Sequence, residues 1–454
     1  MPINSTKGAA SSQGFGLFIL TSKPYWAIDY YDSNFSASLS NTGSYIDNSG
    51  NIYLLGYNGE RYNNQQIMYW FTKVSSQGVL LSQKRFYGGS NGSVPKQKNF
   101  YDKTNNFIYV LADNGQLAVT KIDAVNATIS WNVYQNSSND TNGALSQAVA
   151  VDSSQNVYVC GYMRYSENCD INIYASLIKL NSSGTRQWYK MYRLGTSWYQ
   201  NSFYYSLSID SSSNIICVGS YSYSSSGVYK CLIQKFNSAG TLSWTRYLVM
   251  PTTSQFCELF CLSIDSSSNI YVGGYASNSN GFVAKYNSSG TLQWQNYISG
   301  GSVVVSSCVD SSDNVYFYDQ SNTIYKFDSS GVLQWQRIFT GNNGNVSSYA
   351  SLQYDSISNS LIIGTSFTPT GAYADAFTIK YPVDGSSLGS YTVGNISFTI
   401  STNSKTISTA SLTSGSETLT NYSKAAVLGN GSSSTSIDNI NTLVKVAIWV
   451  LILN

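Results

Sequence analysis

The chain has 454 residues, a net charge of +2 and only 11% charged residues, so phosphate-directed binding of nucleic acid is not expected. It contains no histidine, which excludes Ser-His-Asp and Cys-His catalysis and every histidine metal ligand. Apolar residues make up 42% of the chain, and its 38 tyrosines and many Ser, Asn and Gly residues favour strands and tight turns over helices.

The N-terminal stretch MPINSTKGAASSQGFG has no charged region followed by an apolar segment, so we do not expect a signal peptide. Further along, several cysteines stand inside apolar strand patterns such as YVCGY and IICVG. We expect them to be buried free thiols, without a disulfide framework, as in a protein folded in a reducing cytoplasm. The seven are Cys160, Cys169, Cys217, Cys231, Cys257, Cys261 and Cys308.

One sequence unit recurs along most of the chain. Its first half is an apolar residue followed by Asp-Ser-Ser-x-Asn and an apolar run that ends near a glycine, as in VDSSQNVYVCGY and IDSSSNIYVGGY. Successive aspartates are 45 to 58 residues apart, and the second and seventh copies are degenerate. The seven aspartates are Asp47, Asp102, Asp152, Asp210, Asp265, Asp310 and Asp355.

The second half of the unit reads Lys-apolar-x-Ser-Ser-Gly-x-Leu-x-Trp, as in KYNSSGTLQW. Each unit therefore predicts four strands, A to D, with DSSxN as the A–B turn and NSSG as the C–D turn. Seven such units predict an all-β fold, a seven-bladed β-propeller spanning residues 21–392. Five units carry the tryptophan: Trp131, Trp188, Trp244, Trp294 and Trp335.

The repeated residues have structural explanations. The aspartate and serines of DSSxN bond nearby backbone N–H groups, and the asparagine tolerates a left-handed backbone. DSSxN lacks the D-x-D-x-D-G spacing of a calcium loop, so we predict no metal site there, and no cofactor elsewhere. The five tryptophans predict packing between blades.

The connections between blades point to a contact face. The A–B and C–D turns are short and uniform, whereas the B–C and D–A connections on the other face vary, as in YRLGTSWYQNSFYY (192–205). Function is usually carried by irregular loops, and exposed aromatic and arginine side chains dominate binding hot spots. Alternatively, these tyrosines simply pack over the blade edges. The predicted anchors are Tyr165, Arg193, Trp198, Tyr199, Phe203 and Tyr204.

Past residue 392 the repeat stops. Residues 393–454 are rich in Ser and Thr and end in the apolar run LVKVAIWVLILN, which we interpret as a small β-rich appendage with a buried final strand. The last run is too short to span a bilayer as a helix, so no membrane insertion is expected. An exposed strand of this kind invites aggregation; we expect it to be covered by the propeller or, in preference, by another chain. Trp449 is the predicted assembly residue.

The D-S-S-x-N-x-Y-V-x-G units with their trailing SSGxLxW resemble the bacterial β-propeller repeats of secreted and surface proteins. The stretch from Lys7 to Gly16, KGAASSQGFG, resembles a segment at the start of tailed-phage virion appendage proteins, particularly those of marine phages. This resemblance implies that residues 1–20 form an attachment segment, with Lys7 and Gly8 in assembly. The propeller would then be displayed by a virion, on a protein made in the host cytoplasm.

We therefore expect a non-enzymatic virion structural protein, such as a tail fibre, tail tip or head appendage, that assembles through its termini. Its partners would be other virion proteins and a host-surface glycan or protein. A bacterial surface or secreted propeller adhesin is one alternative. A glycan-degrading enzyme is the other, and it would need two paired carboxylates. Three acidic residues in the connections are candidates for that pair, although no motif pairs them: Glu167, Asp170 and Glu258.

Overall fold

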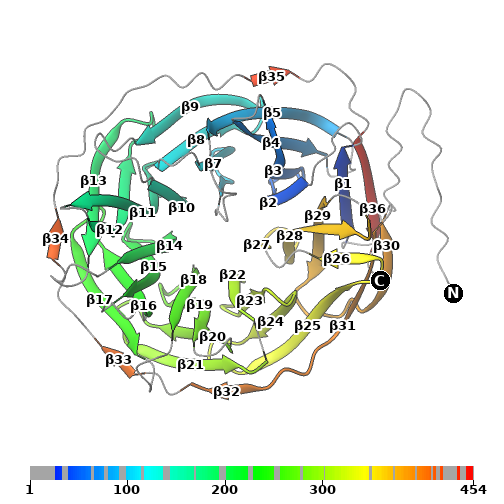
Figure 1. The fold of residues 1–454 in the computed structure, drawn as a ribbon. Coiled ribbons are helices and arrows are strands. Elements are labelled where there is room, and N and C mark those ends of the chain that lie inside the picture. Colours follow the sequence, from blue (N-terminus) through cyan, green and yellow to red (C-terminus); the bar gives the residue numbers. More distant parts are fainter. Residues whose placement is uncertain are drawn as a thin grey trace.

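A computed structural model of the chain shows a ring of seven antiparallel sheets around a central axis, which is a seven-bladed β-propeller (Figure 1). The structure describes residues 26–32, 39–62, 66–75, 80–90, 99–113, 117–135, 144–167, 170–193, 201–222, 229–249, 256–276, 280–300, 302–346, 350–371, 374–393, 396–410, 413–415, 420–422, 437–439 and 446–452. No helix occurs among these residues, and hence none that could cross a membrane.

The first four blades follow the predicted order of strands A to D. Blade one consists of β2 (Leu39–Ile46), β3 (Ile52–Tyr62), β4 (Gln66–Val74) and β5 (Leu80–Ser90). Blade two consists of β6 (Phe100–Asp102), β7 (Phe107–Asp113), β8 (Leu117–Asp123) and β9 (Thr128–Gln135). Blade three consists of β10 (Ala144–Val151), β11 (Val157–Glu167), β12 (Asp170–Leu180) and β13 (Arg186–Arg193). Blade four consists of β14 (Ser202–Ile209), β15 (Ile215–Ser222), β16 (Tyr229–Phe236) and β17 (Leu242–Val249).

Blades five and six have the same order. Blade five consists of β18 (Cys257–Ile264), β19 (Ile270–Ala276), β20 (Asn280–Tyr286) and β21 (Leu292–Ile298). Blade six consists of β22 (Val304–Val309), β23 (Val315–Asp319), β24 (Thr323–Phe327) and β25 (Leu333–Gly341). The A strands of these blades lie nearest the centre of the ring, and the D strands lie toward the rim (Figure 1).

Blade seven is built from both ends of the repeat region. Its A, B and C strands are β27 (Ser351–Asp355), β28 (Ser360–Pro369) and β29 (Asp375–Pro382), with the short β26 (Gly344–Val346) beside β28. Its D strand is β1 (Trp26–Asp32), which pairs with β29. Trp26 lies opposite Lys380, as Trp294 lies opposite Lys285 in blade five. The tryptophan that the seventh sequence unit lacks is thus supplied, in register, by the N-terminal strand.

The C-terminal segment forms a strap around the rim rather than a separate appendage (Figure 1). Its strands add to the outer edges of blades six, five, four, three, one and seven, in that order. They are β31 (Ile396–Thr402), which also pairs with β30 (Gly389–Val393), then β32 (Ile407–Thr409), β33 (Thr413–Gly415), β34 (Thr420–Tyr422), β35 (Ile437–Asn439) and β36 (Val446–Ile452). Lys405 fixes the strap to blade six, since its Nζ lies 2.9 Å from the fully buried Asp319 carboxylate.

The final apolar run is β36, which pairs with β1 over seven residues, with Trp449 opposite Asp29. The prediction of a strand is confirmed, and its pairing partner belongs to the same propeller; cover by another chain stays a prediction. The β-rich segment predicted over 393–454 lies along the rim of the propeller. Every described strand in that range pairs with a blade edge or, like β30, with a strap strand.

The repeated turns have the predicted chemistry, with one difference. Asp265 Oδ1 accepts bonds from the N–H groups of Ser267 and Asn269, and the Asn269 side chain donates to Asp265 Oδ2. In this turn, the left-handed residue is Ser268 (φ 61°), not the asparagine. The asparagine instead holds the aspartate, which explains why both residues recur in the motif.

Two of the cysteines form a disulfide, contrary to the expectation of free thiols. Cys231 in blade four and Cys257 in blade five are bridged across the blade boundary, with their Cα atoms 4.9 Å apart. The two cysteines are 26 residues apart, with strand D of blade four and the following D–A connection between them. They lie close together because the two blades pack side by side, and no sequence motif indicates the pairing. The expectation is confirmed for four others, which are buried thiols outside any disulfide: Cys160, Cys217, Cys261 and Cys308. Cys169 lies outside the described residues.

Replacement of both bridged cysteines by alanine should lower the free energy of unfolding by about 3 kcal/mol, because the bridge closes a loop of this length in the unfolded chain. Urea unfolding of Cys231→Ala/Cys257→Ala measures the effect. Cys261→Ala, at a buried but unbridged cysteine, is the control for loss of a sulfur atom. Equal unfolding midpoints for wild type with and without reductant would contradict the bridge.

Truncation after residue 445 should lower the midpoint of thermal unfolding, because it removes β36 and leaves the outer edge of β1 unpaired. Calorimetry of the truncated chain, beside a control that lacks only residues 453 and 454, measures the shift. If both truncated chains unfold at the wild-type temperature, β36 contributes nothing to closure of the ring.

Candidate functional site

The structure relocates three of the predicted loop anchors. Arg193 is the last residue of β13, and Phe203 and Tyr204 lie within β14, so the expected loop is shorter than its sequence indicated. All three are buried, with relative exposures of 5%, 8% and 0%. Their prediction as exposed anchors is therefore wrong.

Two of these buried side chains have partners inside the propeller. Arg193 Nη1 donates to Asn172 Oδ1 at 3.3 Å, and its guanidinium lies over the Tyr174 ring at 5.2 Å. The Tyr204 hydroxyl donates to Gln234 Oε1, and burial raises the pKa of Tyr204. The Arg193 contacts join two strands within blade three, and the Tyr204 contact joins two strands within blade four.

Most of the other predicted site residues stay untested. Tyr165 lies in β11, whereas the remaining loop and N-terminal residues lie outside the described part of the chain: Lys7, Gly8, Trp198 and Tyr199. Among the acidic candidates, Glu167 and Asp170 face each other at the tip of the β11–β12 hairpin of blade three. Glu258 lies in β18 of blade five, so the fold does not place the three acidic residues on one blade.

A bulge in the A strand recurs at the same place in five blades. In each case one A-strand residue is skipped in the pairing with strand B. Bulges redirect a side chain, and they are common beside binding sites. The skipped residues are Thr42, Gln147, Tyr205, Phe260 and Val305. Only the bulges of blades four and five carry an aromatic side chain.

The glycine of the repeated motif makes room for this bulge. A Cβ on Gly274 would lie 1.9 Å from the carbonyl oxygen of Glu258, and one on Gly219 would lie 2.0 Å from that of Phe203. The B strand can approach the bulged A strand this closely only without a side chain. In blades four and five the repeated glycine therefore permits the close approach of the bulged strand. It does not mark the bulge by itself, because blade six is bulged with Asp319 at this position and blade seven has Gly364 there without a bulge.

The two aromatic bulge residues belong to a row of rings across blades three to five, which we call the aromatic row: Tyr162, Phe203, Tyr205, Phe260 and Tyr275. Tyr162 meets the edge of Phe203, and the next three contacts are near-parallel, with ring centroids 5.0 to 6.1 Å apart. All but Phe203 are half-buried. The row lies near the strand ends that lead into the B–C and D–A connections.

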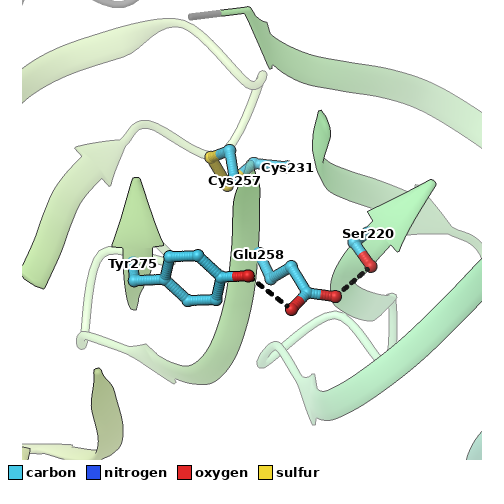
Figure 2. Close-up of a disulfide and its surroundings, with 5 residues drawn as sticks. All are labelled: Ser220, Cys231, Cys257, Glu258 and Tyr275. Carbon is cyan, nitrogen blue, oxygen red and sulfur yellow. Dashed lines mark hydrogen bonds between the residues drawn. A yellow bond between two sulfur atoms is a disulfide. The ribbon is translucent and has the colours of Figure 1, made fainter. Parts of the chain in front are cut away.

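Glu258 lies beside the aromatic row and is held by three hydroxyl groups. Tyr205 and Ser220, both of blade four, donate to its Oε1 at 3.1 and 3.0 Å, and Tyr275 of blade five donates to Oε2 at 3.0 Å. Figure 2 shows Ser220 and Tyr275 on either side of the carboxylate, next to the Cys231–Cys257 bridge. The site therefore spans a blade boundary that is also fixed covalently.

The raised pKa values of Tyr205 and Tyr275 keep their hydroxyl groups as hydrogen-bond donors. Burial, followed by the negative charge of Glu258, raises the pKa of Tyr205, and the same two causes raise the pKa of Tyr275. Both phenols stay protonated at neutral pH and donate to the carboxylate. The arrangement suits binding through ring stacking and hydrogen bonds. Glycoside hydrolysis would need a second carboxylate about 5–10 Å away, whereas the hydrogen-bonding partners of Glu258 in the described chain are all hydroxyls.

No protein-family model and no curated protein matches the sequence. Among solved structures, the WD40 repeats of RRP9 are similar, with a TM-score of 0.50, 11% identity and coverage of 76% of this chain and 94% of that one. BamB from Moraxella catarrhalis has a TM-score of 0.40, 11% identity and coverage of 75% and 85%. The propeller domain of the trilobed protease from Pyrococcus furiosus has a TM-score of 0.47, 8% identity and coverage of 78% and 98%.

At such identities the RRP9 match supports the fold and nothing more. The chain is a seven-bladed β-propeller, and its function has to be argued from its own residues.

Gly274→Ala should destabilise the chain by about 1–3 kcal/mol, because its Cβ forces the bulged strand away. Gly371→Ala is the matched control, since Gly371 has a positive φ of 76° with open space around it and tests backbone strain alone. Urea unfolding compares the two variants. A Gly274→Ala chain as stable as wild type would show that the close approach of these strands is not required.

Proposed function

We propose that the chain is a non-enzymatic attachment protein that displays its propeller on a phage virion and binds a host-surface glycan with the B–C/D–A face. The observation that carries the binding proposal is the aromatic row with Glu258 beside it, at the end of the blades where the variable connections lie. Aromatic rings stack on the apolar faces of ligands, while the carboxylate accepts hydrogen bonds from polar groups.

The virion part of the proposal rests on a different observation, the likeness of KGAASSQGFG to the N-terminal segments of tailed-phage appendage proteins. Other virion proteins would hold that segment. The strap supports such a role, because it pairs the rims of six blades with a single continuous segment. A displayed protein that must persist outside the cell benefits from an edge-protected sheet.

Glycan binding should depend on the aromatic side chains at this face. Phe256 stacks on Tyr229 and is 42% exposed, so its replacement by alanine should weaken binding to a glycan array by about tenfold or more, as loss of an exposed aromatic contact does in hot spots. Val332→Ala is the control, because Val332 is 56% exposed on the C–D turn of the opposite face. Equal binding by both variants would contradict use of the B–C/D–A face.

Membership of a virion has its own test. Mass spectrometry of purified particles, produced from the gene in its natural genome, should detect the chain as a structural component. Its absence from the particles, with the protein present in the producing cells, would overturn the virion proposal. That result would leave the glycan-binding proposal standing.

A further inference from the structure

The charge of Glu258 is not neutralised within the described chain. The ion pairs found there engage other carboxylates, and each of those has a lysine partner: Asp210, Asp265, Asp310, Asp319 and Asp355. Glu258 instead accepts three hydrogen bonds from neutral hydroxyls. A half-buried carboxylate without a counter-ion leaves a negative potential at the site, which an external cation can satisfy.

The carboxylate also has unused acceptor capacity. An ionised carboxylate has roughly four acceptor positions on its two oxygens. Oε1 accepts from two hydroxyls, but Oε2 accepts only from Tyr275. One further donor can therefore bind at Oε2 without displacing any existing partner.

The surrounding rings favour the same kind of ligand. The faces of aromatic rings carry negative charge density and attract organic cations. Around Glu258 these rings include Tyr205, Tyr275 and Phe260 of the aromatic row, and Tyr229 lies near enough for the Glu258 charge to contribute to the raised pKa of its phenol. The ring faces and the Glu258 carboxylate therefore both contribute to a negative electrostatic potential at the site.

A metal ion and an anion both fit this arrangement poorly. A calcium ion takes six to eight oxygen ligands and a magnesium ion about six, and the described residues contain no group of three acidic, cysteine or histidine side chains that could hold a metal. An anion would be repelled by the carboxylate and by the ring faces. An organic ammonium group matches both.

We propose that Glu258 and the aromatic rings around it bind an organic ammonium group on the ligand. The ammonium either donates an N–H hydrogen bond to Oε2 or lies over the ring faces, where its charge is attracted. This inference rests on the proposed function in taking the same face as the contact face. The ammonium could be the free amine of an amino sugar or the quaternary group of a choline substituent. Both are charged where an N-acetylated sugar is neutral.

Titration calorimetry of the full chain with glucosamine, choline and N-acetylglucosamine tests the proposal. We expect at least one of the charged probes to bind about tenfold more tightly than N-acetylglucosamine, the scale of a cation–π contact reinforced by a carboxylate. Preference for glucosamine over choline identifies an amino sugar as the source, and the reverse identifies a quaternary ammonium.

Three variants separate charge from structure. Glu258→Gln should abolish the preference for the charged probe. Tyr275→Phe removes one hydroxyl donor but keeps the charge, and should retain the preference. Asp384→Asn removes an exposed charge on the turn that follows β29 in blade seven and should change nothing. Thermal unfolding of each variant establishes that it is folded, so that a loss of binding reports on the site.

The outcomes distinguish the two proposals. If neither glucosamine nor choline is bound better than N-acetylglucosamine, or if Glu258→Gln keeps the preference, the ammonium inference is overturned. Glycan-array binding that persists in that case leaves the attachment function standing. Binding of a charged probe that depends on Glu258 supports the inference even if the chain is absent from virions.

Discussion

The packing of each tryptophan on the next blade is the contact on which the ring depends. The indole of Trp294 lies against Gly331 of the following C–D turn, where an added Cβ would come within 2.7 Å of it, and its Nε1 donates to the carbonyl of Ser329 at 3.2 Å. Lys285 reaches the same carbonyl while its ammonium lies 3.7 Å from Asp265 of its own blade. The motif residues Asp, Lys, Gly and Trp are therefore parts of one junction between blades.

Ring closure uses the same strand position. Blade one has Ser82 there, whereas the last sequence unit, which has no tryptophan of its own, takes its D strand from the other end of the chain, with Trp26 in the tryptophan register. The strap then pairs β36 with that N-terminal strand. Blade seven is thus closed by both termini of the described chain, one strand outside the other. Four blades have a tyrosine bonded to the motif aspartate. Blade four has Ile216 at that position, and its Lys235 Nζ lies 2.8 Å from the Asp210 carboxylate, closer than the 3.7 Å of the Lys285–Asp265 pair in blade five.

The fold was predictable from the sequence because the residues of the blade junction recur every 45 to 58 positions. They mark the A–B turn and the C–D turn of each blade. The strap was not predictable, since four of its strands are only three residues long and carry no detectable periodicity. The Cys231–Cys257 bridge was missed because it joins strands of different blades. The contact face inferred from the variable connections stays a prediction, whereas Arg193, Phe203 and Tyr204 failed as exposed anchors because the strands extend further into that stretch than its composition suggests.

The site around Glu258 depends on departures from the repeat. Its hydroxyl donors come from three strands in two blades. The bulges that hold Tyr205 and Phe260 are not marked by the repeat, because blade seven has the same strand-B glycine without a bulge. The most direct test is a crystal structure of the full chain with an oligosaccharide of free glucosamine units. We expect ligand density against the Glu258 carboxylate and the rings of Tyr205 and Tyr275. Density confined to the A–B/C–D face or to the rim would contradict the proposed binding site.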